Sequence, residues 1–119
     1  MCSSDLLAPE ARLEWLPLEA IAYRGSIATN KMRFELEPGA EMFGWDILAL
    51  GLPAANECFD DPDHGMHGAY TQEIEIPGFW LERGTVRAKD ALLLNSPLGW
   101  AGKRVMGTLW FAKIGRAHV

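Results

Sequence analysis

Apolar and polar residues alternate along much of the chain with a period of two. The pattern is clearest over 12–15, 32–37 and 70–76, where large, mainly apolar side chains alternate with charged or small polar ones. A period of two is typical of a β-strand that has one face on a core. A proline, which cannot donate a ladder hydrogen bond, follows each run: Pro17, Pro38 and Pro77. We therefore predict three strands that end near these prolines.

Further strands are predicted between and after these three. Segments 79–82 and 85–88 flank Arg83-Gly84, which suggests a tight hairpin at that dipeptide. The apolar run 105–111 predicts a buried strand near the C-terminus. Segment 42–50 is apolar enough for a strand or a short helix, and its glycine and tryptophan, both poor helix residues, favour the strand.

Little helix is expected. Residues 52–57 have room for one helical turn, and the polar composition of 56–68 predicts an exposed loop. The chain shows no internal repeat and no low-complexity tract. The pattern as a whole predicts an all-β fold, a meander of short strands.

The two ends do not resemble the sequence between them. The adapter bases GTG TGC TCT TCC GAT CT, with GTG as a start codon, translate as residues 1–6, and the complementary strand translates as Ile-Gly-Arg-Ala-His-Val at the other end. We therefore expect 1–6 and 113–119 to be sequencing-adapter read-through, and segment 7–112 to be the native part. On this view the natural reading frame continues past Ala112.

Composition narrows the classes of protein. The formal net charge is −5 and the Lys and Arg residues are scattered, which argues against nucleic acid as a partner. No apolar run approaches the roughly 20 residues of a membrane span, so no membrane association is expected. Between the two ends only Cys58 remains as a cysteine, which fits a reducing cytoplasm better than a secreted disulfide framework. The 119 residues allow one domain at most.

Four motifs, in order, resemble those of one family. They are Trp-Leu-Pro-Leu-Glu-Ala-Ile from Trp15, Phe-Gly-Trp-Asp-Ile-Leu-Ala-Leu-Gly from Phe43, Gln-Glu-Ile-Glu-Ile-Pro-Gly-Phe-Trp-Leu-Glu-Arg-Gly from Gln72, and Ser-Pro-Leu-Gly-Trp-Ala-Gly from Ser96. Together they resemble the UreD (UreH) family of urease accessory proteins. The similarity spans nearly all of 7–112, as a partial UreD-like domain that lacks the first and last parts of the family pattern.

The resemblance implies a fold and a role. The fold would be the helical β-stack of UreD, and the role would be a non-catalytic, cytoplasmic one in inserting nickel into apo-urease. Nickel would be held weakly and in transit through a water-filled interior. The implied partners are apo-urease and the UreF and UreG accessory proteins, with UreG supplying GTP hydrolysis. This chain has no phosphate-binding Gly-x-x-x-x-Gly-Lys-Ser/Thr string of its own.

Two carboxylates are candidates for such a nickel path. Glu19 and Asp46 are flanked by apolar residues, where an ionised group is costly unless it is paired, hydrogen-bonded or facing water. Carboxylate oxygens along a polar interior would suit a divalent cation that must be released again. The alternative for both residues is a structural role. Trp15 and Trp45 are interpreted as core residues, and Pro17 as a strand terminator.

The loop that follows segment 52–57 offers a second kind of candidate. Glu57, His64 and His67 lie in or beside a stretch that also contains Cys58 and several aspartates. Nickel accepts imidazole and thiolate, so capture of the metal by this loop is a hypothesis. A solvated acidic loop is the simpler interpretation, because His-x-x-His in a loop does not hold both rings on one face as a helical pair does.

Enzymatic function has little support in the sequence. The chain lacks a Gly-x-Ser-x-Gly nucleophile motif, and the neighbours of Cys58 are acidic, whereas a reactive cysteine has basic ones. A small metal-dependent β-barrel of cupin type is an alternative, but it needs a His-x-His pair on a strand. A β-rich interaction scaffold unrelated to urease is the third possibility.

Overall fold

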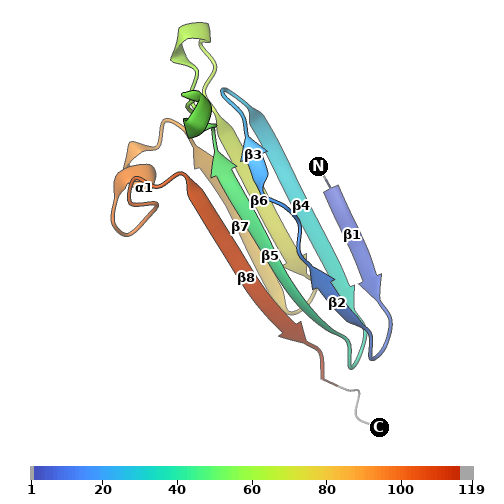
Figure 1. The fold of residues 1–119 in the computed structure, drawn as a ribbon. Coiled ribbons are helices and arrows are strands. Elements are labelled where there is room, and N and C mark those ends of the chain that lie inside the picture. The colour runs from blue at the N-terminus through green and yellow to red at the C-terminus, as the bar shows by residue number, and fades with distance from the viewer. Residues whose placement is uncertain (1, 116–119) are drawn as a thin grey trace.

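The computed structural model describes residues 2–115, which form two layers of β-strand with little helix (Figure 1). The prediction of an all-β fold is confirmed. The elements in chain order are β1 Cys2–Leu7, β2 Arg12–Trp15, β3 Ala20–Ala22, β4 Ile27–Leu36, β5 Glu41–Leu50, the 3₁₀ turns η1 Pro53–Ala55 and η2 Pro62–His64, β6 Ala69–Ile76, β7 Trp80–Arg87, α1 Ala91–Asn95 and β8 Val105–Lys113. No helix among these residues is long and apolar enough to cross a membrane.

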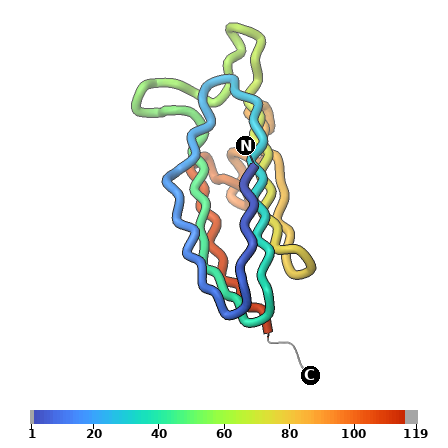
Figure 2. Tube along the Cα trace, turned by 90° about the vertical axis from the view of Figure 1, so that its right-hand side faces the viewer, coloured from blue at the N-terminus to red at the C-terminus, as the bar shows by residue number. Residues whose placement is uncertain are grey.

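The strands form two four-stranded sheets that face each other. Sheet A has the order β1-β4-β6-β7, and in sheet B the central β5 pairs with β2 and β3 on one side and with β8 on the other. The pairs β1–β4, β4–β6, β2–β5 and β3–β5 are parallel, whereas β6–β7 and β5–β8 are antiparallel. Figure 2 shows the chain passing back and forth between the two layers.

This connectivity differs from the predicted meander. Among the strands described, β6 and β7 are the one pair that is consecutive in the chain and hydrogen-bonded. The others pair with strands two or more elements away, because the chain crosses to the opposite sheet between partners. Alternation identifies a strand and its buried face, but it carries no information about which strand lies beside it. The crossing pattern agrees with the expected resemblance to a helical β-stack.

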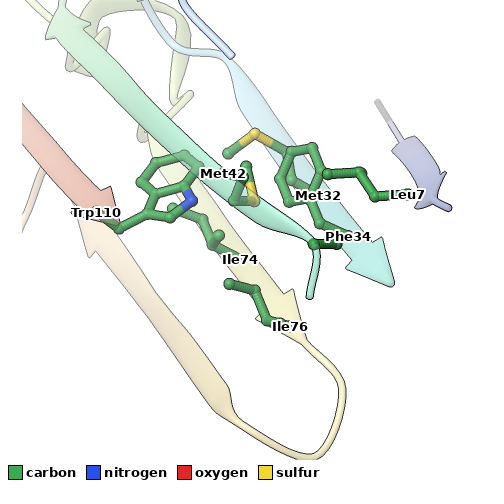
Figure 3. Close-up of a cluster of buried hydrophobic side chains, with 8 residues drawn as sticks. Leu7, Met32, Phe34, Met42, Ile74, Ile76 and Trp110 are labelled. Carbon is green, nitrogen blue, oxygen red and sulfur yellow. The ribbon is translucent and has the colours of Figure 1, made fainter. Parts of the chain in front are cut away.

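The core lies between the inner faces of the two sheets. Its largest buried side chains come from several strands and converge as Figure 3 shows: Leu7, Met32, Phe34, Met42, Ile74, Ile76 and Trp110. A second cluster lies nearer to α1 and comprises Ala22, Leu48, Leu50, Phe59, Tyr70, Val86, Leu94 and Trp100. The apolar positions of the predicted strands 32–37 and 70–76 are therefore on the core, as the period of two indicated.

The predicted hairpin at Arg83-Gly84 is wrong. Strand β7 runs unbroken through these residues, which pair with Glu73 and Gln72 of β6. The chain turns at Pro77-Gly78 instead, where Gly78 has a φ of 81°. Glycine adopts such a left-handed conformation without the steric cost that a Cβ would bring, and this explains why the turn forms there.

Strand β8 exists as predicted, but it is not buried. It is the edge strand of sheet B, and Val105, Leu109 and Phe111 on its outer face are 60%, 66% and 64% exposed. Trp110, on the inner face, is buried. An apolar run does not distinguish a strand covered on both faces from one covered on a single face, and the prediction failed for that reason.

The outer faces of the two sheets differ in chemistry. On sheet A, Arg33 bonds to Glu35 and Glu75, and Arg83 lies 3.7 Å from Glu73. On sheet B, the outward positions of β5 and β8 are mainly apolar: Phe43, Trp45, Ile47, Ala49, Val105, Leu109 and Phe111. Trp45, which we interpreted as a core residue, is therefore a half-buried residue of this outer face.

Three smaller expectations have clear outcomes. Segment 42–50 is strand β5, and the helical turn expected in 52–57 is η1. The loop 56–68 is largely exposed, although Phe59 inserts into the second core cluster. Helix α1 was not predicted from the sequence; the side chain of Asp90 caps it by accepting a hydrogen bond from the amide of Leu93 at 3.1 Å.

Both ends that we expect to be read-through lie partly in the described structure. Residues 2–6 belong to β1, which pairs with β4, and Lys113 is the last residue of β8. Residues 1 and 116–119 lie outside the described residues. Neither observation tests where the residues come from, so the expectation stays a prediction.

Candidate functional site

Four polar side chains meet in the layer between the sheets. Asp46 is on the inner face of β5 and is 5% exposed, and its Oδ2 accepts a hydrogen bond from Nε2 of Gln72 on β6. Tyr70 lies two residues before Gln72 on the same face, and Asn30 of β4 is the register partner of Gln72. We call Asn30, Asp46, Tyr70 and Gln72 the inter-sheet polar cluster. It combines groups from both sheets.

Burial dominates the electrostatics of the cluster. It raises the pKa of Asp46 because the charged form loses its hydration, and the hydrogen bond from Gln72 partly opposes this shift. The pKa of Tyr70 is also raised, first by burial and then by the negative charge of Asp46, against a hydrogen bond with Asn30. Among residues 2–115 no cationic side chain forms an ion pair with Asp46. A cation at this position would relieve the cost of the buried charge.

Several buried polar atoms of the described residues have no hydrogen-bond partner. They include Oδ1 of Asn30, whose residue is 8% exposed, and the indole Nε1 atoms of Trp15 and Trp110. Buried polar atoms in folded proteins are nearly always satisfied by protein or by water. The interior is therefore a mixed layer with unused donors and acceptors rather than a purely apolar core.

A cleft between β7 and β8 leads from the surface toward the cluster. It has a volume of about 350 Å³, and its polar lining includes Tyr70, Gln72, Glu82 and Thr108. Thr108 is the register partner of Asp46. Apolar side chains from Leu48, Val86 and the region of α1 complete the walls. The cleft therefore extends from Tyr70 and Gln72 of the cluster to the edge strands β7 and β8 of the two sheets.

The structure separates the predicted site residues. Asp46 is in the interior, whereas Glu19 is exposed in the segment between β2 and β3. Glu57 is exposed and lines a different cleft of about 400 Å³ beside Cys58. His64 and His67 are in the loop at the upper end of Figure 1. Only one of the five candidates, Asp46, thus lies between the sheets.

The loop histidines are each held by a separate carboxylate. Nδ1 of His64 lies 3.0 Å from Oδ1 of Asp61, and Nδ1 of His67 lies 2.8 Å from Oδ1 of Asp60. The contact with His64, followed by that with Arg24, lowers the pKa of Asp61. In the described part of the chain, no group of three or more His, Cys, Asp or Glu residues is arranged to hold a metal ion. The two pairs each engage the Nδ1 atom of one ring and do not form a shared site.

Three members of the cluster were missed by the sequence interpretation. Gln72 falls on the inward face of the alternating segment 70–76, so a polar residue in an apolar register was the available signal. Tyr70 falls on the same face, where the alternation grouped it with the large, mainly apolar side chains and gave no sign of a polar role. Asn30 precedes the segment in which we recognised alternation, and it gave no signal of its own.

Two facing sheets around a buried carboxylate and its amide and phenol neighbours define a β-stack scaffold with a polar cluster in its apolar interior. Comparison with known proteins gives this scaffold a family. The model of the UreD urease accessory protein family matches residues 6–118. The chain belongs to the UreD family of urease accessory proteins, as the four sequence motifs predicted.

Individual relatives agree with the family match. The UreD urease accessory protein of Leptothrix cholodnii is 58% identical over 106 residues, which cover 89% of this chain and 36% of the relative. That of Variovorax paradoxus is 56% identical over 105 residues, covering 88% of this chain and 36% of the relative. The chain thus spans about a third of the length of these curated relatives.

Proposed function

We propose that this chain is part of a metallochaperone scaffold. The scaffold carries nickel toward apo-urease during urease maturation, and the chain catalyses no reaction. The observation that supports this best is the buried carboxylate of Asp46, which has a hydrogen bond from Gln72 but no cationic partner among the described residues. The proposed setting is the cytoplasm. The proposed partners are UreF, UreG and apo-urease, with UreG supplying GTP hydrolysis.

The donor set suits a cation in transit. Asp46 offers one carboxylate, and Asn30 an unpartnered amide oxygen, as hard to borderline ligands for Ni²⁺. The described inner faces add no imidazole or thiolate, because His64, His67 and Cys58 are all in the loop outside the layer. A single carboxylate with neutral oxygen ligands would bind Ni²⁺ weakly and release it easily. Nickel is therefore cargo in this proposal, and not a resident cofactor.

Glu19, Glu57, His64 and His67 have a lesser place in the proposal. A carboxylate that holds one imidazole nitrogen orients the other toward a metal, so the two histidine–aspartate pairs suit weak surface capture of nickel. Glu19 and Glu57 are too exposed to line the inter-sheet layer in this structure. The cupin-like alternative loses support, since its histidines would have to be on strands beside the carboxylate.

The test is a chimera assayed for urease activation. In the full-length Leptothrix cholodnii relative, this sequence would replace its own matching segment, in cells that contain urease and its other accessory proteins but no other UreD. We expect the chimera to restore urease activity and Asp46→Asn to lower it at limiting nickel. Glu75→Gln, on the charged outer face of sheet A, is the matched control and should have no effect. Equal activity for Asp46→Asn and the control would overturn the role given to the interior.

A further inference from the structure

The cationic side chains that lack an ion-pair partner gather in one segment of the chain. Among residues 2–115, half of the lysines and arginines lie beside a carboxylate: Arg12, Arg24, Arg33, Arg83 and Lys113. Of those in the described chain that do not, all except Lys31 are in segment 87–104, namely Arg87, Lys89, Lys103 and Arg104. The segment has one carboxylate, Asp90, which caps α1. A chain with a net charge of −5 therefore has one locally positive segment.

The same segment also exposes large apolar side chains. We call residues 87–104, which comprise α1 and the turns around it, the α1 lobe; it projects beside the start of β8 (Figure 1). Leu92 is 80% exposed and Leu98 is 100% exposed. Leu94 and Trp100 of the lobe are buried in the second core cluster and attach it to the sheets. The lobe thus presents leucines and unpaired cations to solvent from a fixed base.

Hydrogen bonds within the lobe hold its tip in one conformation. The amide of Trp100 donates to the carbonyl oxygen of Leu93 at 2.8 Å, and the amide of Leu98 donates to Oγ of Ser96 at 3.2 Å. Gly99 packs so closely on this backbone that an added Cβ would collide with the carbonyl oxygen of Leu93. A surface that is already ordered loses little conformational entropy on binding, which favours recognition of a partner.

A cleft of about 390 Å³ lies between the lobe and β8. Its walls are mainly apolar: Leu93, Leu98 and Trp100 of the lobe, and Val105 and Met106 of β8. Lys103 is the charged residue of the lining. An apolar cleft with a cation in its wall suits an apolar side chain from a segment that also carries negative charge.

We propose that the α1 lobe is a docking surface for an acidic, amphipathic segment of a partner protein. An apolar side chain of that segment fills the cleft beside Leu98, and its carboxylates lie against the unpaired cations of the lobe. Complementary charge orients the approaching partner and excludes basic segments. The proposal uses neither a metal ion nor any member of the inter-sheet polar cluster, so it stands or fails separately from the proposed function.

An anionic lipid surface is the other kind of partner that cations and exposed leucines can recognise. Two features of the structure favour protein instead. The cleft is concave and has to be filled by a single projecting group, which a partner side chain supplies. The rest of the chain is strongly negative and would be repelled by an anionic membrane.

The experiment begins with a selection that does not assume the partner sequence. The whole chain is immobilised, and a phage-displayed library of random peptides is the probe. We expect the selected peptides to be enriched in Asp and Glu around a large apolar residue. The best peptide is then synthesised, and fluorescence anisotropy gives its dissociation constant, which should rise with salt because the cations are exposed.

Two variants of the lobe and two matched controls locate the binding site. Lys103→Glu should weaken binding of the peptide about tenfold, and Leu98→Ser should weaken it at least as much. Lys31→Glu makes the same charge change at the unpaired cation of β4, and Ile27→Ser removes an apolar side chain that is 79% exposed there. Neither control should alter binding. All four residues are exposed, and equal thermal midpoints would show that the variants are folded.

Each result decides for or against the lobe. Selection of no peptide, or of basic or neutral peptides, would overturn the proposal. So would a peptide that binds Lys103→Glu or Leu98→Ser as tightly as the unmodified chain. Cosedimentation with vesicles of phosphatidylglycerol and phosphatidylcholine tests the other partner. If the chain sediments with these vesicles, both lobe variants abolish this, and no acidic peptide is selected, a lipid surface replaces the protein partner.

Discussion

The indole Nε1 of Trp45 donates a 2.9 Å hydrogen bond to the carbonyl oxygen of Pro17. These residues belong to two of the sequence motifs that identify the family, and they are 28 positions apart. The bond links β5 to the segment after β2, where the proline has ended the strand and left a carbonyl group to be satisfied. Trp45 thus fixes this segment to the outer face of sheet B through one hydrogen bond.

Replacement of Trp45 by Phe tests how much this hydrogen bond contributes to stability. The substitution keeps an aromatic ring but removes the donor, so we expect the free energy of unfolding to fall by about 0.5–1.5 kcal/mol. Chemical denaturation measures the change. Phe43→Leu is the comparison, since it removes a neighbouring outer-face ring, 6.4 Å from that of Trp45, without a hydrogen bond. A loss no larger than that of the comparison would show that the bond contributes little.

The raised pKa of Asp46 gives a prediction about pH. A carboxyl whose pKa is higher in the folded state than in the unfolded state, about 3.9, favours folding while it is protonated. That stability is complete below the unfolded pKa and is lost as the pH rises through the folded pKa. Without metal, Asp46→Asn should therefore be more stable than the unmodified chain at pH 7, on the order of 1 kcal/mol, and the two should converge toward pH 4.

Thermal unfolding midpoints over pH 4–8 measure this difference. Asp90→Asn, at an exposed cap of α1, is a control for the general effect of removing a negative charge. If Asp46→Asn proved less stable than the unmodified chain at pH 7, the ionised carboxylate would be stabilised by its protein surroundings, and the case for a cation position at Asp46 would fail.

The position of the β6–β7 turn can be tested with two glycines. Gly78 has a φ of 81° at the turn, and Ala there should cost about 1 kcal/mol of stability because its Cβ disfavours this conformation. Gly84 is within β7 and does not have a positive φ, and an added Cβ would meet no atom there within 4 Å, so Gly84→Ala should be close to neutral. A larger loss of stability for Gly84→Ala than for Gly78→Ala would indicate that the chain turns at Arg83-Gly84.

The exposed apolar face of sheet B should make the chain prone to self-association. Leu109 is 66% exposed on the free-edge strand β8, and a lysine there introduces a charge that opposes strand pairing. We expect Leu109→Lys to increase the monomer fraction on size-exclusion chromatography. Ile27→Lys changes an apolar residue that is 79% exposed on the charged face of sheet A, and it should have little effect. Equal gains from both would indicate a general effect of charge.

The sequence was informative where one residue and its near neighbours determine the structure. Alternation located β4 and β6 and the face each turns to the core, since the period of two follows from strand geometry alone. It did not give the strand partners. The parallel pairing of β4 with β6, about forty residues apart, depends on the crossing of the chain between sheets.

The candidate site likewise contains one residue that a single segment identified and others that only the strand pairing revealed. Asp46 was recognised because a carboxylate among apolar residues is conspicuous in a single segment. Asn30 and Tyr70 became part of the site only when β4 and β6 were placed side by side. Glu82 could not be placed at the cleft between β7 and β8 while the chain was expected to turn at the next two residues, because the register of β7 was then wrong.

The pairing of strands that are distant in the chain also bears on how the chain acquires its fold. Strand β5 pairs with β2 and β3, which precede it in the chain, and with β8, which follows it by more than fifty residues. Strand β4 pairs with β6, which is also synthesised later. Contacts between such distant segments make folding slow, since long loops must close before the contacts form. During synthesis the inner faces of β4 and β5 emerge before β6 and β8 exist. The nascent chain thus has an interval in which its apolar strands depend on one another, or on another protein, for protection from aggregation.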